Sequence, residues 1–187
     1  MPQSDRRPGR ASSRDKLLDA AADLVVKHGV QNLTIDSVAA AAGVTKAGLI
    51  YHFKTRDELL SALVERMVEA FDVLKSAAQE GSSTTSPKAA LSRLLNDTLD
   101  MPQDQRQLLA NLLVAVCLQP SLAGPVQALY ARDYEALSGG DDGGRAMLLA
   151  AAMDGIALIE LLHLHKFTSQ QRQAMRAALE REIRELP

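Results

Sequence analysis

The residues best suited to chemistry lie in one short window, Thr34–Phe53, which reads TIDSVAAAAGVTKAGLIYHF. Thr34 and Thr45 stand where helices would begin, and a threonine hydroxyl can cap a helix start. Capped helix starts still offer backbone N–H groups that bind phosphate oxygens. Lys46 and His52 add side chains that can donate hydrogen bonds to phosphates or base edges. This set of donors is suited to binding a polyanion such as DNA.

The spacing within the window predicts two short helices, about 35–42 and 46–53, separated by a tight turn at Gly43. Ala39 is small where the two helices would cross closely. The apolar contact that fixes the crossing is expected from Val38, Val44 and Leu49. Such a helix-turn-helix can place its second helix in the major groove of DNA. The alternative is an ordinary helical hairpin that packs its alanine-rich face into a core.

The rest of the chain also reads as helices, so the predicted fold class is all-α with about nine helices. Helix starts are marked by capping boxes at Ser12–Asp15, Thr55–Glu58 and Thr168–Gln171. Polar or glycine-rich breaks lie at 81–86 and 139–144, and no alternating strand pattern occurs. The other predicted helices span about 16–28, 57–79, 87–100, 104–118, 125–137, 145–165 and 169–186.

The charge distribution favours binding of a polyanion, and the motif content argues against catalysis. Residues 1–56 hold nine Lys and Arg against five acids, a net charge of +4, whereas residues 57–187 carry a net charge of −6. A basic end on an acidic body suits a polyanionic partner. No nucleophile–base set, carboxylate pair, glycine-rich phosphate loop or metal cluster has a usable spacing, so we expect no catalysis, cofactor or metal.

The sequence also suggests where the protein acts. Cys117 is the sole cysteine, which fits a reducing compartment. The longest apolar stretch, 146–162, is interrupted by charged residues, so we expect no membrane span. Arg6, Arg7 and Arg10 have no apolar segment behind them, which argues against a secretory signal. A cytoplasmic location is therefore expected.

From about Arg14 to Leu60 the sequence resembles the TetR family of bacterial transcriptional regulators. The resemblance is carried by LLDAAADLVVKHG, by LTIDSVAAAAGVTKAGLIYHF and by KTRDELL. KTRDELL is the informative segment, because a helix-turn-helix motif does not by itself require this sequence after its second helix. The resemblance implies a DNA-binding domain at 13–57 and a helical regulatory and dimerisation domain at 58–187. Before them, the basic residues from Arg6 to Arg10 predict a flexible arm at 1–12, which could enter a minor groove or stay disordered.

Carried over by position, the resemblance implies a set of DNA-contacting residues. Arg56 stands where the family usually has a lysine on the phosphate backbone, and His52 could equally be a core or capping residue. Ile50 departs from the family by replacing a common phosphate-contacting tyrosine. Asp36 lies where some members read bases, and we expect it to cap the second helix instead. The expected contacts are Thr34, Thr45, Lys46, Ala47, Gly48, Tyr51, His52 and Arg56.

For the C-terminal part, the resemblance implies a homodimer through the helices at about 145–165 and 169–186, and a pocket for a small apolar or amphipathic effector. The expected function is a repressor that binds a palindromic operator and is released by that effector. A monomer, and a helical small-molecule carrier without DNA function, are the alternatives. His163-x-His165 does not change the expectation of no metal, because alternate residues on a helix point apart and no acid or cysteine completes a site. The candidate pocket residues, each of which could instead be core, are Met101, Leu108, Asn111, Leu112, Cys117, Tyr130, Tyr134 and His163.

Overall fold

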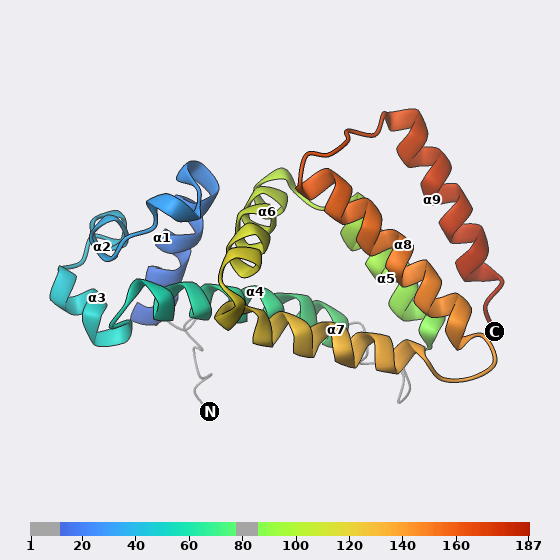
Figure 1. Ribbon diagram of the computed structural model, residues 1–187, viewed down its shortest axis with the longest axis horizontal. Coiled ribbons are helices and arrows are strands. Elements are labelled where there is room, and N and C mark those ends of the chain that lie inside the picture. Colours follow the sequence, from blue (N-terminus) through green and yellow to red (C-terminus); the bar gives the residue numbers. More distant parts are fainter. Residues whose placement is uncertain (1–11, 78–85) are drawn as a thin grey trace, which may run out of the picture. The chain divides into compact units, whose positions relative to one another are not determined.

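The computed structural model describes residues 12–77 and 86–187, with the backbone alone for 71–77, and every regular element in these ranges is helical (Figure 1). The predicted all-α fold is therefore confirmed. The basic arm, apart from Ser12, and most of the polar break at 81–86 lie outside the described residues. The elements are α1 (Ser13–His28), η1 (Val30–Asn32), α2 (Ile35–Ala42), α3 (Lys46–His52), α4 (Arg56–Ala77), α5 (Pro87–Leu99), α6 (Gln103–Leu118), η2 (Pro120–Leu122), α7 (Ala123–Leu137), α8 (Gly143–Leu161) and α9 (Ser169–Arg184).

The chain divides into two compact units, Met1–Leu63 and Val64–Pro187, below called unit 1 and unit 2. The division falls inside α4, so this one helix contributes its first turns to unit 1 and the rest to unit 2. The functional boundary that the sequence suggested, between residues 57 and 58, lies at the start of the same helix and stays a prediction.

Unit 1 is built on the apolar stripe of α1 and on α2, which packs against it. The N-terminus of α1 has the predicted capping box, because the Ser12 hydroxyl accepts from the Asp15 backbone N–H and the Asp15 carboxylate accepts from the Ser12 N–H. Burial of leucine-sized side chains, each contributing about 1.5–3 kcal/mol, holds the unit together. Its fully buried large residues are Leu17, Leu18, Val25, Leu33, Val38, Leu49, Leu59, Leu60 and Leu63.

Unit 2 has its core where α5, α8 and α9 lie side by side (Figure 1). Helix α8 is apolar on most sides, as its sequence indicated, and it packs on both α5 and α9. The central side chains of this core come from all three helices: Leu91, Leu95, Leu99, Leu149, Ala150, Met153, Leu179 and Ile183.

A cluster of buried charge ties three helices of unit 2 together. The Glu160 side chain on α8 is only 9% exposed and accepts hydrogen bonds from Arg106 on α6, at 2.5 Å, and from Arg172 on α9. Arg172 also donates to the Leu99 carbonyl, and Arg106 to the Met101 carbonyl at 3.1 Å. These bonds fix the α5–α6 connection against α8 and α9.

The end of α8 differs from its prediction. The helix ends at Leu161 rather than near residue 165, and the chain leaves it through His163, whose φ is +54°. The His163 N–H donates to the Glu160 carbonyl and the Leu164 N–H to the Ile159 carbonyl, which is the pairing of a Schellman motif. Glycine usually occupies the left-handed position of this motif, so the histidine gave no sequence signal for a helix end.

Replacing the buried carboxylate, Glu160→Gln, should lower the free energy of unfolding at neutral pH by about 3 kcal/mol, because two guanidinium groups lose their counter-charge. Burial by itself raises the pKa of Glu160, but the hydrogen bonds and charges of Arg172 and Arg106 outweigh it and lower the pKa. The stabilisation is thus present above the ordinary pKa of 4.5 and is lost as the pH falls through the lowered value.

Urea unfolding at several pH values measures this effect. The difference in the free energy of unfolding between the wild type and Glu160→Gln should decrease as the pH falls below the ordinary pKa of a glutamate. Glu182→Gln is the matched control, because its partner Arg145 is on the surface. This substitution should lower the free energy of unfolding much less. A loss from Glu160→Gln no larger than the control's would contradict the role given to this cluster.

Candidate nucleic-acid interface and cavity

The turn between α2 and α3 is fixed by local hydrogen bonds. Thr34 and Ser37 form a capping box at the start of α2, with the Thr34 hydroxyl accepting from the Ser37 N–H at 3.0 Å. At its end Gly43 takes the left-handed conformation, with φ +67° and ψ 32°. The Gly43 N–H donates to the Ala40 carbonyl and the Val44 N–H to the Ala39 carbonyl, again a Schellman motif. The chain therefore reverses sharply just before Thr45.

Packing then orients α3. Val38 and Leu49 are fully buried and Ala39 is 4% exposed, as the sequence predicted for the helix crossing. Val44 was expected in the same contact but is 43% exposed, so that assignment is wrong. It belongs to the turn, where the reversal points its side chain to solvent. Phe53, directly after α3, is buried and anchors the end of the helix.

The opposite side of α3 is exposed and carries most of the predicted DNA-binding residues. The Thr45 hydroxyl accepts from the Gly48 N–H at 3.1 Å, which caps the helix. Lys46, Ala47 and Gly48 are exposed, and Tyr51 keeps 85% of its surface in solvent. His52 is half-buried and meets the Tyr51 ring edge to face, with 5.1 Å between centroids.

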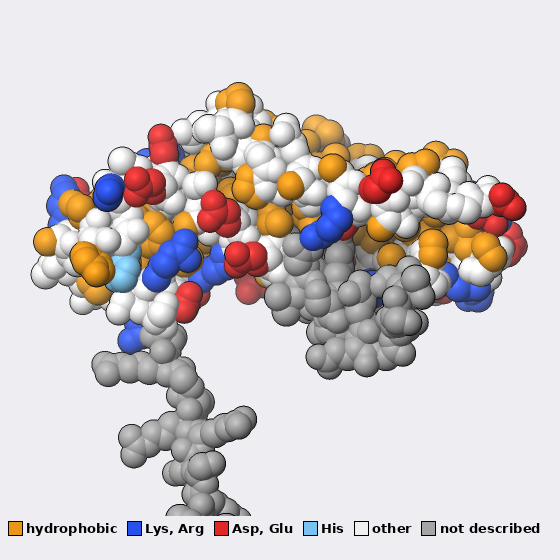
Figure 2. All heavy atoms as spheres, turned by 90° about the horizontal axis from the view of Figure 1, so that it is seen from below, with side chains coloured by type: hydrophobic (Ala, Val, Ile, Leu, Met, Phe, Trp, Pro, Cys, Tyr) orange, Lys and Arg blue, Asp and Glu red, His pale blue; other side chains and the backbone are white. Residues whose placement is uncertain are grey.

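Asp36 does not cap α2, contrary to the prediction, because Thr34 and Ser37 supply the cap. The Asp36 carboxylate instead pairs with Lys46, with 3.0 Å between Nζ and the nearer oxygen. Both side chains are more than half exposed, so the pair is accessible to solvent and to ligands. Figure 2, which shows one face of the molecule, has basic, acidic and hydrophobic side chains intermingled over unit 1.

The Arg56 guanidinium makes hydrogen bonds within unit 1, whereas a residue that only contacts DNA phosphates would extend into solvent. Its Nε donates to the Leu33 carbonyl at 2.8 Å and its Nη2 to the Val30 carbonyl at 2.9 Å. The guanidinium thus joins the start of α4 to η1 and the residue after it. A phosphate contact by Arg56 stays a prediction, and the structure adds a role in positioning α4.

Arg56→Ala should lower the free energy of unfolding by about 1–3 kcal/mol, because it leaves two backbone carbonyls without their charged donor. Arg56→Lys should recover only part of this, since an ammonium group cannot reproduce the planar arrangement of donors. Urea denaturation measures both variants, and Lys54→Ala serves as an exposed neighbouring control. If Arg56→Ala were as stable as that control, the positioning role would be wrong.

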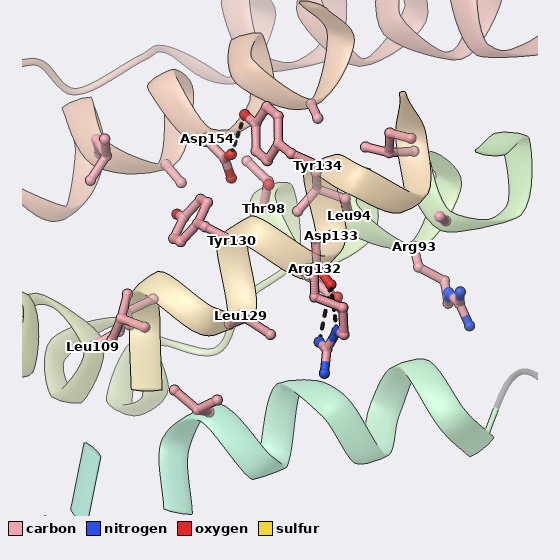
Figure 3. Close-up of a pocket in the computed structure, with 18 of the residues that line it drawn as sticks. Arg93, Leu94, Thr98, Leu109, Leu129, Tyr130, Arg132, Asp133, Tyr134 and Asp154 are labelled. Atoms are coloured by element: carbon pink, nitrogen blue, oxygen red, sulfur yellow. Dashed lines mark hydrogen bonds and ion pairs between the residues drawn. The ribbon is translucent and has the colours of Figure 1, made fainter. Parts of the chain in front are cut away.

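Unit 2 contains a cavity of about 620 Å³ lined by residues of α4 to α8 and of the α5–α6 connection (Figure 3). Of the predicted pocket residues, Met101, Tyr130 and Tyr134 line it. Helix α6 faces the cavity with Leu109, Leu113 and Val116, which lie on a different side of the helix from the set chosen from the sequence. The predicted residues outside the wall are Leu108, Asn111, Leu112, Cys117 and His163. Of these, Leu112 is fully buried, and Cys117 and His163 are exposed.

Two tyrosines and an aspartate gather on one side of this cavity (Figure 3). The Tyr134 hydroxyl donates to the Asp154 carboxylate at 2.9 Å, and the Tyr130 ring lies 6.2 Å from the Tyr134 ring. Burial, then the charges of Asp154 and Asp133, raise the pKa of Tyr130 to about 12. Burial and the hydrogen bond to Asp154 raise the pKa of Tyr134 as well. Both rings therefore keep their hydroxyl protons near neutral pH.

The described residues contain neither a membrane-spanning helix nor a metal-binding group. No helix within them is long and apolar enough to cross a membrane. Across 12–77 and 86–187, no three or more His, Cys, Asp or Glu side chains gather as a metal-binding group.

Comparison with known proteins gives the chain's family. Residues 17–63 match the family model described as bacterial regulatory proteins, tetR family. Residues 88–184, more than half of the chain, match the model described as the tetracyclin repressor-like C-terminal domain. The chain therefore belongs to the TetR family of regulators. The predicted family is confirmed, as is the prediction of a regulator rather than an enzyme at the level of the family.

Curated relatives and solved structures agree with this assignment. The chain is 31% identical over 83 residues to the regulator TtgR of Pseudomonas putida, covering 44% of this chain and 39% of TtgR. It is 25% identical over 121 residues to RutR of Escherichia coli, covering 64% and 57%. The alignments thus span less than two thirds of these relatives.

Solved structures match over more of the chain. The multidrug binding protein EbrR, complexed with imidazole, superposes with a TM-score of 0.68 at 27% identity, covering 95% of this chain and 98% of EbrR. The TetR-family member SCO1917 of Streptomyces coelicolor gives 0.70 at 28% identity, covering 91% and 98%.

Proposed function

We propose that this chain is a DNA-binding transcriptional repressor that binds a palindromic operator as a homodimer and is released by a small-molecule effector. The observation that carries the proposal is the exposed side of α3, which is held by the Gly43 turn and by the buried Leu49 and Phe53, and which carries Lys46 and Tyr51 away from the core. A helix presented in this way can enter the major groove of DNA. The carrier alternative is not favoured, because it leaves this exposed helix without a role. A protein that binds the chromosome would act in the cytoplasm.

Lys46 and Asp36 make the DNA proposal testable, because substitutions at the two positions should act in opposite directions. Lys46→Ala should weaken binding to duplex DNA and reduce the salt slope by about one, through the loss of one phosphate contact. Asp36→Asn should strengthen binding of DNA, because it releases Lys46 from its ion pair and removes a negative charge that would repel the DNA phosphates. Titration of labelled genomic duplexes over a range of salt concentrations measures both effects.

Lys27→Ala is the matched control, since Lys27 is an exposed lysine of unit 1 on α1. It should bind DNA like the wild type. Two results would contradict the proposal: no duplex retained even at low salt, or a Lys46→Ala protein that binds like the Lys27→Ala protein. Sequencing the genomic duplexes that the wild-type protein retains then gives the operator sequence.

The proposed dimer forms through α8 and α9. Leu148 on α8 is 70% exposed, the exposed Ala151 and Ala152 follow it at helical spacing, and the exposed Leu162 comes directly after the helix. Small and branched apolar residues on one side of a helix suit close packing against a partner helix. A twofold dimer would present two α3 helices about 34–36 Å apart, one turn of DNA.

A charge on this face should separate the proposed dimer. Leu148→Glu should shift the protein toward monomer, because pairing would bury the new carboxylate without a partner. The matched control is Leu118→Glu on α6, where the leucine is 78% exposed and lies outside α8 and α9. Light scattering after gel filtration gives the mass of each. A dimeric Leu148→Glu protein, or a monomeric Leu118→Glu protein, would place the interface elsewhere.

The proposed effector site is the cavity of unit 2. Its volume and mainly apolar wall suit a drug-sized molecule. Structures of EbrR, 27% identical over most of its length, hold imidazole and ethidium. Helix α4 reaches the cavity with Met67 and Val68 and begins in unit 1, so it links effector and DNA sites along one helix. If the effector lowers DNA affinity, DNA must lower effector affinity by the same factor.

A further inference from the structure

We propose that the cavity of unit 2 selects a lipophilic organic cation, with Asp154 facing its charge and Tyr130 and Tyr134 forming an aromatic wall beside it. The inference rests on the proposed effector function of this cavity and names the class of molecule that it takes. It concerns binding, so it can be tested without knowing the operator.

The balance of charge in the cavity wall favours a positive ligand. The wall holds three carboxylates, Asp97, Asp133 and Asp154, and two guanidinium groups, Arg93 and Arg132. Arg132 pairs with Asp133 at 3.0 Å, and Figure 3 shows this pair together, away from Asp154 and Tyr134. The formal charge of the wall is therefore −1. In a mainly apolar cavity such a charge acts over a longer range than at an open surface.

The aspartate is held by an aromatic donor. The Tyr134 hydroxyl donates to the Asp154 carboxylate at 2.9 Å. A hydroxyl donor favours the ionised form of a carboxylate. Asp154 comes from α8 and Tyr134 from α7, and the two side chains point toward one another at the cavity (Figure 3). The negative group therefore has a fixed position.

The two tyrosine rings add a second attraction for a cation. They are tilted by 31° with centroids 6.2 Å apart, and Tyr130 keeps 43% of its surface exposed. The face of an aromatic ring attracts cations within about 6 Å of its centroid. Tyr130 is uncharged at neutral pH, and its raised pKa extends this to more alkaline solution, so the ring acts through its face.

The remaining wall sets the lipophilic character of the ligand. It is formed mainly by aliphatic side chains, among them Leu94, Leu109, Leu129 and Leu158. A small hydrated ammonium ion would lose its water without compensating contacts. A bulky cation whose charge is shielded by apolar groups loses less hydration and fills a cavity of about 620 Å³ better.

Tetraphenylphosphonium and tetraphenylborate test the proposal, because they have nearly the same shape and opposite charges. Triphenylphosphine oxide serves as a neutral probe of similar chemistry. Calorimetric titration of the full chain should show binding of the cation at least about tenfold tighter than that of the anion. Asp154→Asn should weaken binding of the cation by about tenfold and leave the neutral probe unchanged. The asparagine oxygen can still accept from Tyr134, so the fold should be kept.

Asp97→Asn is the matched control, because it removes the same charge from another point of the wall. It should weaken binding of the cation less than Asp154→Asn does. Equal binding of cation and anion, equal effects of the two variants, or no binding of the cation would each overturn the proposal. The effector function would survive the first two results if the neutral probe released DNA. DNA binding itself is judged by the duplex titration, which needs no ligand.

Discussion

Gly43 has a backbone conformation that most residues avoid, and the orientation of α3 follows from it. Its left-handed φ of +67° ends α2 and brings the chain back within three residues to the cap of the next helix. A side chain at this position would cost about 1–2 kcal/mol from backbone strain alone, although no neighbouring atom would obstruct a Cβ. The buried Leu49 and Phe53 then determine which side of α3 faces the core. The side left exposed is the one that carries Lys46 and Tyr51.

Unit 2 combines a rigid polar connection with an apolar cavity. Glu160 and its two arginines hold α6, α8 and α9 to the α5–α6 connection, and Met101 in that connection lines the cavity. Asp154 and Leu161, on the same helix as Glu160, also line it. A ligand in the cavity therefore contacts elements whose mutual positions are fixed by buried charge. Helix α4 contributes Met67 and Val68 to the same wall.

The helix starts could be predicted from the sequence because their signals are local. Ser12, Thr34 and Thr168 each cap a helix through a partner three residues away. Features that depend on distant contacts were not predictable: Arg56 binds carbonyls 23 and 26 residues away, and α8 ends at a left-handed histidine. Helix α6 is apolar on several sides, so its periodicity could not distinguish Leu108 and Leu112 from Leu109 and Leu113. Asp154 is one of the charged residues that interrupt the apolar stretch 146–162, and its sequence neighbours do not indicate that it lines the cavity.

The central claim is that the exposed side of α3 contacts DNA directly, and site-specific photocrosslinking tests it most directly. Tyr51 would be replaced by p-benzoylphenylalanine, with Leu118 of α6, which is similarly exposed, replaced in a control. Irradiation with labelled duplex at low salt should produce a covalent protein–DNA adduct from position 51 and none from position 118. Adducts from both positions in equal yield, or from position 118 alone, would contradict the account.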